Sequence, residues 1–102
     1  MDNKTHMLTA AQIDCYANYL YEQERAESTI RKYRHDLTAL LAYLDTAPLT
    51  KAELIGWKEQ LLQRHAPSSV NSMLAAVNSF FFIYGLAGTQ VAAAKNSKSA
   101  LL

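Results

Sequence analysis

Apolar side chains recur along this chain at spacings of three and four residues, in four separate stretches. Such spacing places the apolar residues on one face of an α-helix. The stripes are Ile13, Tyr16, Ala17 and Leu20; Ile30, Tyr33, Leu37, Leu40, Leu41 and Leu44; Leu54, Trp57, Leu61 and Leu62; and Val70, Leu74, Val77, Phe80, Phe81 and Tyr84. We therefore predict four helices, over residues 10–24, 29–45, 51–64 and 68–84.

Capping and breaking residues lie between these stretches. Thr9 with Gln12 and Thr50 with Glu53 have the spacing of a capping box, and Ser28 is a favourable N-cap for the second helix. The turn at residues 66–68 leads into the fourth helix, with Ser68 and Ser69 as its expected caps. Gly85 and Gly88 are expected to end that helix. The connections are short, so consecutive helices should be antiparallel and form two hairpins.

This pattern predicts an all-α fold of four to five helices. We expect a disordered N-terminus over residues 1–8 and a helical domain over residues 9–86. Residues 87–102, rich in Ala, Ser and Lys, are a tail, a linker or a short fifth helix. The length of 102 residues suits a single domain, and 3 Gly and 2 Pro are few for an all-β fold.

Several kinds of chemistry find no support in the residue pattern. The single cysteine, Cys15, cannot form an internal disulfide, and neither a leader peptide nor a membrane-length apolar run is evident. His6, His35 and His65 are too scattered to indicate a metal site, and the adjacent His35 and Asp36 point about 100° apart on a helix. We expect a cytoplasmic non-enzyme without a cofactor, metal, small-molecule ligand or membrane partner. Tyr16, Tyr33 and Tyr84 are interpreted as core residues rather than nucleophiles.

One stretch, residues 27–37 (ESTIRKYRHDL), resembles the second-helix signature of the N-terminal core-binding (SAM-like) domain of tyrosine recombinases, the phage-integrase family. In that signature a Ser or Thr pair opens the helix, basic residues follow, and a Tyr and an Asp-Leu pair come at this spacing. Residues 49–55 and 67–81 resemble the third-helix start and the fourth helix, in the family's order. The resemblance covers about residues 10–86. No one of these motifs is decisive, and their specificity lies in the ordered set.

The resemblance implies a fold of two crossed antiparallel helical hairpins that form half of a C-shaped clamp on DNA. In the family the second and fourth helices face the duplex, while the catalytic residues belong to a second domain. We therefore expect a DNA-binding domain that grips a double-stranded recombination half-site, with strand exchange performed by a catalytic domain absent from this chain.

The expected DNA-binding residues follow the starts of the second and fourth helices. On the second helix and at the start of the third they are Ser28, Thr29, Arg31, Lys32, Arg34, His35 and Lys51; on the fourth they are Ser68, Ser69, Asn71 and Ser72. Guanidinium and ammonium groups bind phosphates, and hydroxyl and amide groups at a helix start add further donors. A solvated charged face with ordinary caps is the competing interpretation.

The fourth helix lacks the Arg or Lys that the family usually carries there, and the formal net charge is only +1. Weak binding is therefore expected. The alternative function is a helical protein-interaction module that keeps the fold. The run Phe80–Tyr84 surrounds its helix, so we expect Phe82 and Ile83 to face outward and to contact other protomers or a catalytic domain.

Overall fold

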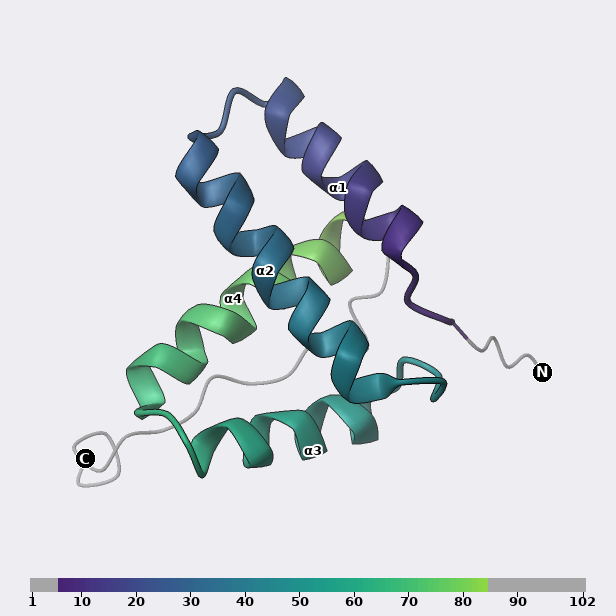
Figure 1. The fold of residues 1–102 in the computed structure, drawn as a ribbon, viewed down its shortest axis with the longest axis vertical. Helices are drawn as coiled ribbons and strands as arrows, with labels where there is room; N and C mark the ends of the chain where they lie inside the picture. The colour runs from purple at the N-terminus through teal and green to yellow at the C-terminus, as the bar shows by residue number, and fades with distance from the viewer. Residues whose placement is uncertain (1–5, 85–102) are drawn as a thin grey trace. The chain divides into compact units, whose positions relative to one another are not determined.

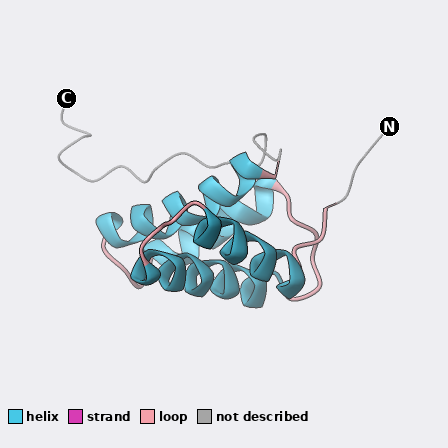
Figure 2. Cartoon of the chain, turned by 90° about the horizontal axis from the view of Figure 1, so that it is seen from above, coloured by secondary structure: helices cyan, strands magenta, loops and turns pink. Residues whose placement is uncertain are grey.

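The computed structural model describes residues 6–84 and contains four α-helices, with no strand among those residues (Figures 1 and 2). The helices are α1 (Ala10–Glu22), α2 (Glu27–Leu44), α3 (Lys51–Leu62) and α4 (Pro67–Ile83). The all-α prediction is confirmed. The chain divides into two units, Met1–Thr50 with α1 and α2, and Lys51–Leu102 with α3 and α4. The predicted tail or fifth helix at 87–102 lies outside the described residues, as do the two glycines expected to end α4.

In the first unit, α1 begins at the predicted capping box. The Thr9 hydroxyl accepts a hydrogen bond from the Gln12 backbone N–H, and the Gln12 side chain accepts one from the Thr9 N–H, each over 3.2 Å. The predicted apolar stripe of α1 is buried in full. After a short turn, α2 returns beside α1, so the two helices form an antiparallel hairpin (Figure 1).

The start of α2 differs from the prediction. The helix begins at Glu27, and its N-cap is Ala26, which has no side-chain capping bond. Ser28 is therefore the second residue of the helix rather than its cap. The acidic Glu27 in the first turn, where the helix dipole favours negative charge, stabilises this earlier start. Leu37, Leu40 and Leu44 are buried as expected.

The segment before α1 is attached to the first unit. The Leu49 backbone N–H donates a hydrogen bond of 2.7 Å to the His6 carbonyl, and both Leu8 and Leu49 are buried. Residues 6–8, which belong to the segment expected to be disordered, thus have defined backbone and side-chain contacts. Residues 1–5 lie outside the described range.

In the second unit, α3 begins at Lys51 and buries Leu54, Trp57 and Leu61. Leu62, which was also predicted on the apolar face, is the last residue of α3 and is 37% exposed, because adjacent helix residues point about 100° apart. Helix α4 begins at Pro67, because proline lacks the N–H that the first helical residue leaves unpaired and its φ suits a helix. Its N-cap is Ala66, so the predicted capping roles of Ser68 and Ser69 are wrong. The apolar stripe of α4 is buried, from Val70 to Phe81.

Two of the three tyrosines assigned to the core are less buried than expected. Tyr16 is buried, Tyr33 is half-buried and stacks on Tyr16 with ring centres 6.4 Å apart, and Tyr84 is exposed. Tyr84 follows the last residue of α4, where its ring packs on Phe80 at 4.6 Å with one side open to solvent. Within residues 6–84, none of the helices has both the length and the apolar character needed to cross a membrane.

Candidate nucleic-acid interface

Four of the predicted DNA-binding residues form one stripe on α2. Ser28, Arg31, Lys32 and His35 are spaced by three, four and seven residues, which places them on a single face of the helix. All four are exposed. We name this set the α2 stripe. Thr29 is half-buried and lies beside the apolar face rather than on the stripe.

Arg31 is the most available cation of the α2 stripe. Its side chain is 70% exposed, and its guanidinium lies 3.8 Å from the carboxylate of Glu27, which is 90% exposed. Exposed pairs at this spacing stabilise a helix by only a few tenths of a kcal/mol (about 0.2–0.5). A phosphate can therefore replace Glu27 as the partner of Arg31 at little cost.

Lys32 has a structural role that the sequence analysis missed. Its ammonium group binds the carboxylate of Asp36, whose side chain is only 5% exposed, and lies 5.9 Å from the centre of the Tyr33 ring. A buried carboxylate needs such a partner, because an unpaired charge inside a protein is strongly unfavourable. The spacing of four residues between Lys32 and Asp36 was the available signal. Lys32 is thus less available to a ligand than Arg31.

His35 also contacts this carboxylate, although adjacent helix residues point about 100° apart. Its Nδ1 lies 3.5 Å from an Asp36 oxygen, at the upper limit for a hydrogen bond, while the His35 side chain is 79% exposed. Asp36 is held mainly by Lys32, so His35 and Asp36 do not have the geometry of a catalytic dyad. His35 remains accessible to a ligand.

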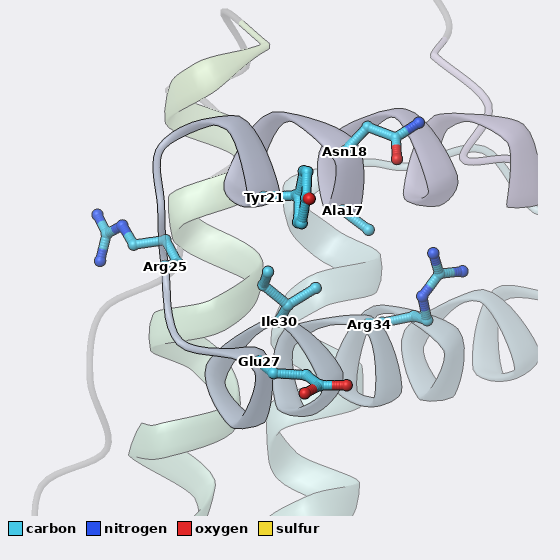
Figure 3. A pocket seen from close by; sticks show the side chains of 7 residues that line it. All are labelled: Ala17, Asn18, Tyr21, Arg25, Glu27, Ile30 and Arg34. Carbon is cyan, nitrogen blue, oxygen red and sulfur yellow. The ribbon is translucent and has the colours of Figure 1, made fainter.

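Arg34 points to the other helix of its unit. Its guanidinium forms an ion pair with the carboxylate of Asp14 on α1, twenty residues earlier in the chain, and the two side chains are 47% and 63% exposed. In Figure 3 the Arg34 side chain extends from α2 toward α1. Arg34 is therefore engaged within the hairpin instead of lying on the α2 stripe.

A pocket of about 460 Å³ lies between α1 and α2 beside Arg34 (Figure 3). Its lining residues are Ala17, Asn18, Tyr21, Arg25, Glu27, Ile30 and Arg34. Ala17 and Ile30 supply apolar surface, whereas the Arg25 side chain points away from the pocket in Figure 3. No group of three or more His, Cys, Asp or Glu side chains suited to a metal ion occurs in the part of the chain that the structure describes.

The second unit contributes mainly uncharged donors. Ser68, Ser69 and Ser72 are exposed at the start of α4, and Asn71 is half-buried. Lys51 is exposed at the first position of α3. Helix α4 has no Asp, Glu, Lys or Arg along its whole length. Its surface can therefore offer hydroxyl and amide groups to a duplex but no cation of its own.

The predicted residues thus fall into two groups, one on each unit. The structure brings Ser28, Arg31, Lys32 and His35 together on α2, and separately Ser68, Ser69, Asn71 and Ser72 on the first turns of α4. That the two groups share one surface stays a prediction.

Comparison with known protein families gives a match over residues 13–83, which run from α1 to the last residue of α4. The matching family is described as phage integrase, N-terminal SAM-like domain. Neither the curated proteins nor the solved structures contain a match to the chain.

Proposed function

Because this chain belongs to the phage integrase N-terminal SAM-like domain family, whose members bind DNA, we propose that it binds double-stranded DNA through the α2 stripe and the start of α4. The observation that carries the proposal is the α2 stripe itself. Ser28, Arg31, Lys32 and His35 are exposed together near the N-terminus of a long helix. Positive side chains and the partial positive charge of a helix N-terminus both attract phosphate.

The start of α4 and Lys51 supply the second set of contacts. Hydroxyl groups of Ser68, Ser69 and Ser72 can donate to phosphate oxygens, and the Asn71 amide can pair with an adenine edge. Thr29 and Arg34 are placed less favourably than the sequence suggested. Thr29 is half-buried, and Arg34 is bound to Asp14.

The wider role that we propose is that of the gripping domain of a site-specific recombinase. The domain holds a recombination half-site in the cytoplasm, while a catalytic domain, with its own nucleophile, performs strand exchange. The contacts available here are few, so the domain alone binds weakly. Linkage to a second DNA-binding domain raises the effective concentration of each arm and strengthens binding.

Fluorescence anisotropy with a short labelled duplex tests this proposal. Three phosphate contacts would lower the affinity about 40-fold between about 50 mM and about 200 mM salt, because the slope of log K against log salt is about −0.9 per contact. Absence of binding at millimolar protein, or binding that does not respond to salt, would contradict it.

A second candidate function is protein interaction through the end of α4. Phe82 is 70% exposed, and Ile83 and Tyr84 are also exposed, which confirms that Phe82 and Ile83 face outward. Adjacent exposed apolar side chains favour contact with another protein, such as a second protomer or a catalytic domain. The ion pairs on α2 and the uncharged α4 weaken DNA binding and are compatible with this second function.

Replacing Phe82 by glutamate is expected to abolish any self-association seen in sedimentation velocity, because a carboxylate would replace the most exposed apolar ring of this patch. Tyr21→Glu is the matched control, since Tyr21 on α1 is a similarly exposed aromatic residue. A monomer–dimer equilibrium that is unchanged in Phe82→Glu, or equally changed in both variants, would count against a contact at this end of α4.

A further inference from the structure

Asp14 occupies a position from which it competes with DNA for Arg34. Its carboxylate, on α1, binds the Arg34 guanidinium on α2. We propose that Asp14 limits DNA binding by holding Arg34 within the α1–α2 hairpin, so that this arginine reaches a phosphate only by exchanging its partner. The inference rests on the proposed function.

Arg34 is close enough to the α2 stripe for such an exchange. Three residues of an α-helix correspond to about 300°, so Arg34 lies about 60° around the helix from Arg31. The long side chain of an arginine can span that interval. In the structure, however, its guanidinium extends toward α1 (Figure 3). The direction of this side chain is thus set by the acidic partner on α1.

The pair is also weak enough to exchange. Both side chains are about half exposed, and solvent-exposed ion pairs contribute little to stability. A phosphate offers Arg34 the same kind of charged, bidentate partner as a carboxylate does. Loss of the competitor should therefore shift Arg34 toward DNA without unfolding the hairpin, because α1 and α2 are also in contact elsewhere and bury apolar residues such as Ile13, Leu20 and Leu37.

The two acidic residues of α2 that pair with cations fit this role less well than Asp14 does. Asp36 is buried, so its release from Lys32 would leave an unpaired charge in the protein interior. Glu27 lies 3.8 Å from Arg31 and is almost fully exposed, so it restrains Arg31 only slightly. Asp14 alone combines a close contact, an exposed site and a position on a different helix.

The test compares Asp14→Asn, Arg34→Ala and their double variant with the unmodified chain, by anisotropy against a labelled duplex at two salt concentrations. Asp14→Asn is expected to bind about two- to fivefold more tightly, the range given by the contribution of an exposed ion pair. Its salt slope should be steeper by about 0.9, because one more phosphate contact is made. In the Arg34→Ala background, Asp14→Asn should not make the salt slope steeper.

Glu22→Gln is the matched control for net charge. Glu22 is exposed on α1 and forms no ion pair with another residue of the range 6–84. Its replacement by glutamine removes one negative charge, as Asp14→Asn does. An equal gain in Glu22→Gln, or a gain that persists in the Arg34→Ala background, would overturn the role of Asp14 while DNA binding by the unmodified chain still stood. If neither the unmodified chain nor any variant binds the duplex at either salt concentration, the proposed function and this inference both fail.

Discussion

Replacing Phe80 by alanine is expected to destabilise the domain by about 3–5 kcal/mol, the usual cost of removing a fully buried aromatic ring and leaving a cavity. Phe80 is 0% exposed, and its ring contacts those of Phe81 and Tyr84 at centre distances of 5.9 and 4.6 Å. Domains of this size are stable by about 5–15 kcal/mol, so the loss would be a large share of the total. Urea denaturation followed by circular dichroism measures it.

Phe82→Ala is the matched control, two residues along the same helix. The chemical change is identical, but Phe82 is 70% exposed. Surface substitutions of this kind usually change the free energy of unfolding by less than about 0.5 kcal/mol. Equal losses in the two variants would show that α4 does not bury Phe80 and expose Phe82 as the structure has them.

The second large effect concerns DNA. Arg31→Ala is expected to weaken binding to a short duplex about tenfold, which corresponds to about 1.4 kcal/mol, and to make the salt slope shallower by about 0.9. Arg31 is 70% exposed on the α2 stripe, and its ion pair with the exposed Glu27 is weak. Its loss therefore removes a DNA contact with little disturbance of the fold. Anisotropy titrations at two salt concentrations give both quantities.

Ala42→Glu controls for the change in net charge. It also lowers the charge by one, on an exposed residue of the same helix. Eleven residues of α-helix separate it from Arg31, about 16 Å, which exceeds the Debye length of about 10 Å at 0.1 M salt. Ala42 lies on the same face of α2 as the stripe but further along it. A loss of affinity as large as that of Arg31→Ala would therefore mean that binding responds to overall charge, or to charge anywhere along this face, and not to the position of Arg31.

Near-neutral charge and pairing within the hairpin together explain why weak binding is expected. Arg31, Lys32 and Arg34 each have an acidic partner in the first unit. DNA must replace these partners, and the cost differs among the three, from low for Arg31 to high for Lys32. The contribution of each cation to binding is therefore expected to follow the order Arg31, Arg34, Lys32.

The helices were predictable because local signals agree along most of the chain. The capping box at Thr9 predicted the start of α1, and the spacing of three and four residues identified most of the buried residues of the four helices, with Leu62 and Tyr84 as exposed exceptions. The start of α2 was misplaced because a serine suggested a cap, whereas the helix begins after Ala26. A serine is a weak signal for the start of this helix, because Ala26 adopts the extended backbone conformation of an N-cap without any side-chain hydrogen bond.

The candidate site was only partly predictable. The cations at 31, 32 and 34 were identified, and the Lys32–Asp36 pair has a spacing that can be read from the sequence. The Arg34–Asp14 pair cannot be read in this way, because it depends on how α1 and α2 are aligned in the hairpin. The exposure of Tyr84 was missed for a similar reason, since it follows the end of α4 and leaves the helical pattern.

The most direct test of the central claim is an NMR titration of the ¹⁵N-labelled chain with a short DNA duplex. The account predicts that chemical-shift changes concentrate at residues 28–35 of α2 and residues 68–72 of α4, and that they diminish as salt is raised. Changes confined to the Phe82 end of α4, or none at all at saturating DNA, would contradict it.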